Sequence, residues 1–211
     1  MRHQSERVPQ KNYRDFNGKP LFYRILETLC QCPSIDAIHI NTDSDVVKEK
    51  APVLDPKIHI IDRPKELCGG DISMNKILLY DMTQVDADYF LQTHSTNPLL
   101  KSATVEDAIN TFLVSKTHDS LFSVTRLQTR LWDADGQAVN HDPGKLQRTQ
   151  DLTPLYEENS NIYIFSRESL EKKKNRIGDK PLMFEISKYE AMDIDEMDDF
   201  QIAEVLKRNG V

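Results

Sequence analysis

The chain has 211 residues, of which 38% are hydrophobic and 29% charged, and this composition predicts one folded domain over residues 1–211. The formal net charge of −7 argues against non-specific binding to nucleic acid, so an anionic ligand would need a local cluster of cations. No apolar run approaches the roughly 20 residues that cross a bilayer, and no secretory signal is recognisable. Three cysteines without a disulfide spacing favour a reducing compartment. We therefore expect a cytoplasmic protein that binds neither nucleic acid nor membrane.

The first twelve residues, MRHQSERVPQKN, carry three cations before any regular element is expected. Arg2, Arg7 and Lys11 suit a polyphosphate when joined by the Ser5 hydroxyl and free backbone N–H groups, because spread negative charge needs several donors at once. The alternative is a frayed basic terminus, which is common. Taken alone, the stretch favours that alternative.

The pattern that follows predicts helices alternating with strands. A helix is expected after Pro20, because the apolar residues behind it repeat at helical spacing, namely Phe22, Ile25, Leu26 and Leu29. Further helices are predicted over 45–51, within 69–82, from about 102 and over 197–210, and strands over 35–43, 57–62, 87–93, 120–125, 161–165 and 189–195. This alternation predicts an α/β sheet covered by helices on both faces.

Residues 126–159 break the alternation. No helical pattern is present there, but Asp135-Gly136 is a hairpin turn signal between RLW and AVN. We interpret the segment as a small β-rich insertion that projects from the sheet without belonging to it. Trp132 within it is typical of an interface anchor rather than of a substrate platform.

Polar segments follow several predicted strands, where open α/β sheets bind their ligands. In the segment DIDEMDD, Asp193 and Asp195 would project to one face of an extended backbone, with Ile194 turned to the core. Such a pair suits a hard cation when phosphates complete its shell, whereas the remaining acids cap the final helix. Asp43, at the end of the first predicted strand, either orients a nucleotide or caps the following helix.

Five motifs occur in one order along almost the whole chain: RHQSERVPQKN, DRPKEL, FLQTHSTNPLL, LYEENSNIYIF and MDIDEMDDF. In this order and spacing they resemble the cytidylyltransferases that activate nonulosonic and related sugar acids, the CMP-N-acetylneuraminate synthetase family, to which the CMP-Kdo synthetases are related. The resemblance implies a three-layer Rossmann-like nucleotide-diphospho-sugar transferase fold with a mostly parallel sheet. It also implies that the insertion is a dimerisation arm that reaches the partner's active site, and hence that the protein is a homodimer.

The resemblance implies roles for individual residues. CTP would be bound by Arg2, Ser5, Arg7, Lys11, Asn12, Arg63 and Ser73. The sugar acid would be bound by His94, Thr96, Lys145, Arg148 and Asn159, the last three across the dimer. Mg²⁺, or Mn²⁺, would be bound by Asp193 and Asp195, which would form the catalytic group together with Arg2 and Lys11. The cationic opening stretch is then interpreted as a CTP-binding loop.

The implied reaction transfers CMP from CTP to the anomeric hydroxyl of a 2-keto sugar acid, a sialic-acid-like nonulosonic acid, and releases pyrophosphate. It needs alignment and charge neutralisation more than covalent chemistry. Mg²⁺ would bridge phosphate oxygens while the opening cations stabilise the leaving pyrophosphate. The alternatives are a CMP-Kdo-type synthetase and a non-catalytic nucleotide-binding relative.

The chain also departs from the family pattern. Where the family shows Gln-Pro-Thr-Ser-Pro-Leu-Arg, this chain has His94 in place of the Gln and Leu100 in place of the Arg, and Glu157 stands where a cation is common. These changes lie on the sugar side, so we hypothesise a changed sugar acid with CTP retained. In addition, the family's apolar first strand is absent before Met1, and we expect translation to begin further upstream.

Overall fold

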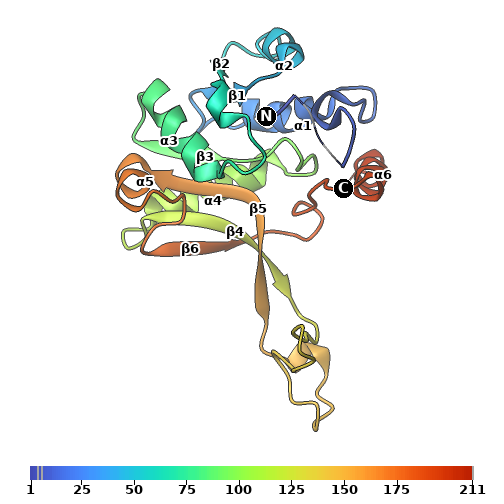
Figure 1. Cartoon of the computed structure of the whole chain (residues 1–211). Coiled ribbons are helices and arrows are strands. Elements are labelled where there is room, and N and C mark those ends of the chain that lie inside the picture. Colours follow the sequence, from blue (N-terminus) through green and yellow to red (C-terminus); the bar gives the residue numbers. More distant parts are fainter. Residues whose placement is uncertain (4, 6, 211) are drawn as a thin grey trace.

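The computed structural model describes residues 1–3, 5 and 7–210, and it arranges them in two sheets with helices around them (Figure 1). β1 (Ile38–Thr42) and β2 (Ile58–Asp62) pair in parallel. The second sheet has the order β3-β5-β4-β6, formed by Tyr89–Gln92, Leu155–Ser166, Ser120–Leu127 and Pro181–Glu185. Within it, β5 runs antiparallel to both of its neighbours, whereas β4 and β6 are parallel.

The helices form two outer layers. The α-helices are α1 (Leu21–Cys30), α2 (Asp45–Lys50), α3 (Met74–Gln84), α4 (Ser102–Val114), α5 (Arg167–Lys173) and α6 (Met197–Arg208), and the 3₁₀ helices η1, η2 and η3 span Lys11–Tyr13, Lys65–Leu67 and Thr149–Asp151. On one face of β5, Ile162 and Ile164 pack in the core of α1 and α4, while Tyr163 and Phe165 on the other face pack with α3 and α5. The predicted three-layer α/β fold is therefore confirmed. Among the described residues, no helix has the length and apolar character needed to cross a membrane.

Helical spacing predicted several helices correctly. α1 follows Pro20 and buries the expected apolar side chains, Phe22, Ile25, Leu26 and Leu29. α4 begins at Ser102, and α6 has acidic residues in its first turn and a left-handed Gly210 (φ 82°) after its end. Ser44 stands at the N-cap position of α2, but its hydroxyl lies 3.0 Å from Nδ1 of His3 and does not cap the helix.

Two elements differ from the prediction. Residues 189–195 form a turn and an irregular extended stretch, so the sixth strand predicted there is wrong. The sixth strand is β6, which lies at the edge of its sheet and begins with Pro181; a proline, which has no N–H, is tolerated at an edge. α5 was not predicted, because its lysine-rich sequence resembles a solvated loop.

The predicted insertion is the outer part of a long hairpin that extends away from the sheets (Figure 1). β4 and β5 continue into it and remain paired as far as Leu127 and Leu155, so the stem belongs to the sheet, contrary to the prediction. The turn at Asp135-Gly136 is confirmed, because Asp133 N donates to Gln137 O at 2.9 Å and Gly136 has a φ of 73°.

A cavity of about 1100 Å³ lies between the two sheets. Among the described residues no strand pairs with the facing edges of β1 and β3, and residues of both strands line the cavity. Apolar side chains of α1, α3 and α4 line one part of it, and polar residues beyond the carboxyl ends of β1 and β3 line another. The expectation of a strand upstream of Met1 stays a prediction.

Candidate active site

Apolar contacts anchor the loop that carries the cations. Val8 and Phe16 are fully buried in a cluster with Ile194 and with Phe200 of α6, and the rings of Phe16 and Phe200 lie 5.4 Å apart edge to face. This cluster brings a polar, cation-rich segment against residues 193–195. It therefore positions the charged side chains of this loop beside the aspartate segment.

Hydrogen bonds tie the same loop to the strand ends. Asn12 Nδ2 donates to Arg2 O at 2.7 Å and its Oδ1 accepts from Ser95 Oγ at 2.7 Å, just beyond β3. Beyond β1, Asp43 Oδ1 accepts from His3 N at 2.8 Å. Asp43 therefore holds this loop, Ser44 and not Asp43 occupies the N-cap position of α2, and the orientation of a nucleotide by Asp43 stays a prediction.

Oppositely charged side chains meet where the loop touches the aspartate segment. Arg7 Nη2 lies 2.5 Å from Asp195 Oδ1, and Arg7 Nη1 lies 3.8 Å from Glu196 Oε1. Lys11 Nζ donates to Ile194 O at 2.5 Å and lies 3.8 Å from Asp195 Oδ1. Burial lowers the pKa of the Lys11 ammonium group, although both nearby aspartates oppose that shift. The loop thus places the cations of Arg7 and Lys11 beside the aspartate segment 193–195.

The two aspartates flank a fully buried residue, as predicted. Ile194 has no exposed surface, and its N–H donates to Thr96 O at 2.9 Å, so Asp193 and Asp195 project to the other side. Partial burial, with a contribution from the Asp195 charge, raises the pKa of Asp193, and a hydrogen bond from Thr96 opposes the shift. The pair therefore has two hard oxygen donors that repel one another.

Arg63 lines another wall of the cavity. Its Nε donates to Asn41 Oδ1 at 2.5 Å and its Nη2 to Asn41 O at 3.1 Å. Asn41 Nδ2 in turn donates to Asp81 Oδ1 at 2.5 Å, and burial raises the pKa of Asp81. The Arg63 guanidinium is therefore held in place while part of it remains directed to the cavity.

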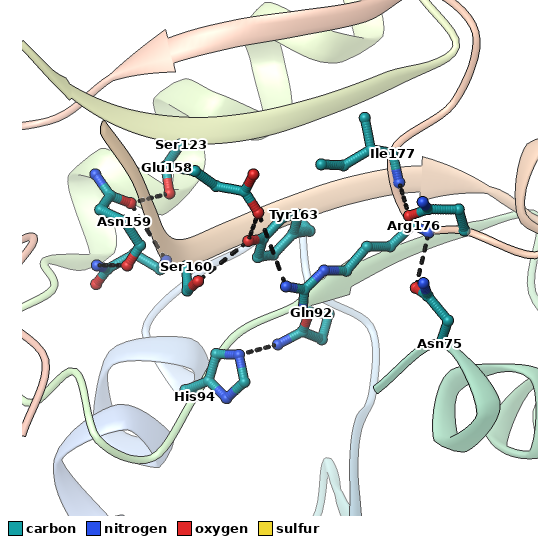
Figure 2. Close-up of polar contacts among 12 residues, drawn as sticks. Asn75, Gln92, His94, Ser123, Glu158, Asn159, Ser160, Tyr163, Arg176 and Ile177 are labelled. Carbon is teal, nitrogen blue, oxygen red and sulfur yellow. Dashed lines mark hydrogen bonds and ion pairs between the residues drawn. The ribbon is translucent and has the colours of Figure 1, made fainter. Parts of the chain in front are cut away.

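His94 belongs to a third polar group, shown in Figure 2. Its Nε2 lies 3.0 Å from Gln92 Nε2, and Gln92 Oε1 accepts from Arg176 Nη1 at 2.6 Å. Burial, with the charge of Arg176, lowers the pKa of His94 to about 4. The imidazole is consequently neutral near pH 7.

These walls enclose one cavity, and most of the predicted residues reach it. Those that line it are Arg2, Ser5, Arg7, Lys11, Asn12, Arg63, His94 and Thr96. Asp193 and Asp195 lie beside it, in contact with Thr96, Arg7 and Lys11. Cations, a carboxylate pair and a neutral imidazole around one space suit a polyphosphate, a divalent cation and a polar second ligand.

The model of the cytidylyltransferase family matches residues 1–207. The chain belongs to the cytidylyltransferase family. It is 27% identical over 211 residues to an N-acylneuraminate cytidylyltransferase of Streptococcus agalactiae serotype V, a match that covers 93% of this chain and 49% of that protein. It is 28% identical over 220 residues to a CMP-N,N'-diacetyllegionaminic acid synthase of Legionella pneumophila, covering 96% of this chain and 91% of that protein.

The likeness extends to solved structures. A CMP:2-keto-3-deoxy-manno-octonic acid synthetase complexed with CTP matches with a TM-score of 0.72 and 15% identity, covering 100% of this chain and 97% of that one. At this identity the match establishes the fold, which agrees with the prediction from the motifs. The chain spans about half the length of the first curated relatives, since it covers 49% of the streptococcal protein.

Besides Asp193 and Asp195, four predicted residues do not line the cavity in the described part of the chain. Ser73 precedes α3 without a capping hydrogen bond. Lys145 and Arg148 are exposed on the arm, where Arg148 pairs with Asp151 at 2.7 Å. Asn159 is buried in β5, accepts from Ser123 Oγ at 2.5 Å and donates to Thr125 Oγ1 at 2.9 Å. Their predicted ligand contacts remain predictions.

Other residues near the cavity were not predicted. Asn41 and Asp81 hold Arg63, and Gln92 and Arg176 hold His94. Gln92 stands two residues before His94, so period-two alternation places them on the same side and would have indicated the pair. Arg176 follows the exposed run EKKKN, and no local pattern separates it from those residues.

Asp193 and Asp195 fit a divalent metal ion of the Mg²⁺ type. They supply hard carboxylate oxygens on the open side of Ile194, and their mutual repulsion would be relieved by a cation. Among the described residues, no group of three or more His, Cys, Asp or Glu is arranged to hold a metal ion. Phosphate oxygens would therefore have to complete the coordination, and Arg7 would have to release Asp195.

Proposed function

We propose that this cytidylyltransferase transfers CMP from CTP to the anomeric hydroxyl of a 2-keto sugar acid of the nonulosonic type and releases pyrophosphate. The observation that carries the proposal is the single cavity that collects the cationic loop, Arg63 and His94 beside the Asp193–Asp195 pair. The names of the streptococcal and Legionella relatives support the class of acceptor. Because CTP is a cytoplasmic nucleotide, we also propose a cytoplasmic location.

The described cations suit the leaving group. Arg2, Arg7 and Lys11 would neutralise the triphosphate and the charge that grows on the departing pyrophosphate. In the transfer, a bond forms between the anomeric oxygen and the α-phosphorus while the bond from that phosphorus to the pyrophosphate oxygen breaks. The protein's contribution is to align these atoms and to keep the charges in place.

Asp193 and Asp195 would hold Mg²⁺, for which Mn²⁺ is a substitute. When bound, the ion supplies charge neutralisation at the phosphate oxygens. With Asp195 bound to the ion, Arg7, which contacts that carboxylate at 2.5 Å, would be free to bind the triphosphate. Lys11 stays near both, anchored by Ile194 O.

We also propose that the hairpin arm forms a homodimer. Large apolar side chains are exposed on it, and they are Trp132 (54% exposed), Val139 (53%), Leu146 (96%) and Tyr156 (42%). Covering them with a second copy would bury apolar area and bring Lys145 and Arg148 towards the partner. We expect a dimer by light scattering, and Leu146→Ser with Trp132→Ser should weaken it, whereas Val53→Ser, at an equally exposed site away from the arm, should not. A wild-type monomer at high concentration would contradict the dimer.

The proposed reaction is tested by pyrophosphate release from CTP and Mg²⁺ with a panel of nonulosonic and ulosonic acids. Release with a nonulosonic acid is expected, and no release with UTP or ATP in place of CTP. Best turnover with a Kdo-type acid would favour the CMP-Kdo-type alternative. CTP binding without release for any acid would favour a non-catalytic nucleotide-binding protein.

A further inference from the structure

Arg176 is fixed from several directions, although it does not line the cavity. Its side chain is 17% exposed, and its Cζ lies 3.5 Å from the centroid of the Tyr163 ring. Nη2 lies 4.0 Å from Glu158 Oε1, which also accepts a hydrogen bond from the Tyr163 hydroxyl. Its backbone N–H donates to Asn75 Oδ1 at 3.1 Å (Figure 2). The guanidinium therefore has little freedom to turn away from its remaining partner, Gln92.

This arrangement determines the orientation of the Gln92 amide. An arginine side chain can only donate, so the Gln92 atom 2.6 Å from Arg176 Nη1 must be the oxygen. The amide nitrogen then faces the other way, where it lies 3.2 Å from Thr93 O and 3.0 Å from His94 Nε2. Gln92 is itself buried, so the two N–H groups of its amide have these partners in place of water.

The amide orientation in turn determines the protonation of His94. An amide N–H can only donate, so His94 Nε2 must accept and carries no proton. The single proton of a neutral imidazole is then on Nδ1. No other described residue forms a hydrogen bond with His94, and the ring lines the cavity. Among the described side chains, the charged group that acts on the ring is Arg176, which disfavours its protonation.

We propose that Gln92 and Arg176 are positioning residues that hold His94 as the neutral Nδ1–H tautomer, so that it offers one oriented N–H donor to an oxygen of the acceptor ligand. The identity of that ligand as a sugar acid rests on the proposed function, whereas the tautomer does not. A site of this kind favours a ligand with an acceptor oxygen at this position and disfavours one with an N–H group there. Arg176 acts only through Gln92, because it does not itself reach the cavity.

The tautomer is tested directly on the wild-type protein by NMR of ¹⁵N-labelled histidine side chains. His94 is expected to show a protonated Nδ1 and an unprotonated Nε2 from pH 8 down to pH 5.5. A protonated Nε2, or a doubly protonated ring at pH 7, would overturn the proposal. The measurement needs neither a ligand nor a variant, so it stands even if no sugar acid is a substrate.

The coupling to Gln92 is tested with Gln92→Glu. A carboxylate beside Nε2 accepts instead of donating, so His94 should gain a proton on Nε2 and titrate at a higher pH. Gln84→Glu is the matched control, because Gln84 is exposed at the end of α3 and the chemical change is the same. Unchanged His94 signals in a folded Gln92→Glu variant would overturn the proposal.

The consequence for the ligand is tested with Arg176→Lys and with Arg208→Lys, an exposed arginine of α6, as control. With the sugar acid that supports pyrophosphate release, Arg176→Lys should raise the KM for that acid about tenfold, as for one lost hydrogen bond, and leave the KM for CTP unchanged. Equal changes in both KM values, or none, would contradict a positioning role. Absence of release with every acid would instead count against the proposed function alone.

Discussion

The proposed nucleotide end of the cavity, at Arg7 and Asp195, and its proposed acceptor end, at His94, hold their arginines in opposite ways. At the nucleotide end, Arg7 and Asp195 are 54% and 48% exposed and pair with one another, whereas Lys11 beside them is 11% exposed and donates to Ile194 O. At the acceptor end, Arg176 is 17% exposed and is enclosed by Tyr163, Glu158 and Gln92. Exposed ion pairs contribute little to stability and exchange partners easily, whereas a buried cation with several partners is fixed.

This difference suits the two proposed ligands. A triphosphate with a metal ion brings its own charges, so cations and carboxylates that neutralise each other beforehand can separate when it binds. A sugar acid is distinguished by the directions of its hydrogen bonds, and for this purpose a donor must be fixed before the ligand arrives. The comparison predicts that substitutions at the nucleotide end change activity. Substitutions at the acceptor end should instead change stability and selectivity for the acceptor.

The largest expected effect is at the aspartate pair. Asp195→Asn removes a metal-binding carboxylate charge, so the rate of pyrophosphate release should fall on the order of 10²-fold or more. Asp198→Asn is the matched control, because Asp198 is exposed in the first turn of α6 and should retain full activity. Steady-state assays of both variants check this, and an Asp195→Asn enzyme with near wild-type rates would refute the metal site.

The next effect concerns the free energy of unfolding, and it compares Arg→Gln substitutions at the two ends of the cavity. Arg176→Gln leaves Glu158 and the Gln92 oxygen without their cation and should lower the free energy of unfolding by about 2 kcal/mol. Arg7→Gln disrupts an exposed ion pair and should lower the free energy of unfolding by only about 0–1 kcal/mol. Urea unfolding of the two variants measures both values, and equal losses would remove the distinction between the two ends.

A smaller effect is expected on CTP binding. Arg7→Gln should weaken the binding of CTP with Mg²⁺ about tenfold, because one charge-assisted contact to phosphate is lost. Arg14→Gln, in the same loop but outside the cavity lining, should bind as the wild type does. Isothermal titration calorimetry compares the two, and equal affinities would mean that Arg7 serves only to pair with Asp195.

A further expected effect is a pH dependence of stability. Burial lowers the pKa of His94 from 6.5 to about 4, so between these values the unfolded chain binds a proton that the folded chain does not. The contribution of His94 to stability is thus constant above pH 6.5 and decreases as the pH falls from 6.5 towards 4. His94→Gln should make the unfolding midpoint depend less on pH over this range. An identical pH profile in the variant would show that His94 titrates normally.

Much of the fold could be predicted because its signals are local. α1, α4 and α6 have apolar spacing and end signals that act within a few residues. The wrong sixth strand shows the limit of such signals. Residues 189–195 have the alternating pattern of a strand, but the segment that pairs with β4 is Pro181–Glu185. The alternation of side chains within a segment does not determine which distant segment it pairs with.

The residues of the candidate site also divide into those with a local sequence signal and those whose role depends on distant contacts. The loop cations and the aspartate pair were predicted because they cluster in the sequence and match family motifs. Arg176 and Asp81 were not, because their roles depend on Gln92 and Asn41, which are far away along the chain. Asn159 was expected at the sugar and is bonded within the sheet, since β5 places its amide between Ser123 and Thr125.

The most direct test of cytidylyl transfer is phosphorus NMR of the protein with CTP, Mg²⁺ and a nonulosonic acid. The structure and the family lead us to expect one new phosphodiester signal, from CMP joined to the sugar acid, for each pyrophosphate formed, and neither signal with Asp195→Asn. Unchanged CTP with every acid, or pyrophosphate together with free CMP, would contradict transfer to a sugar acid.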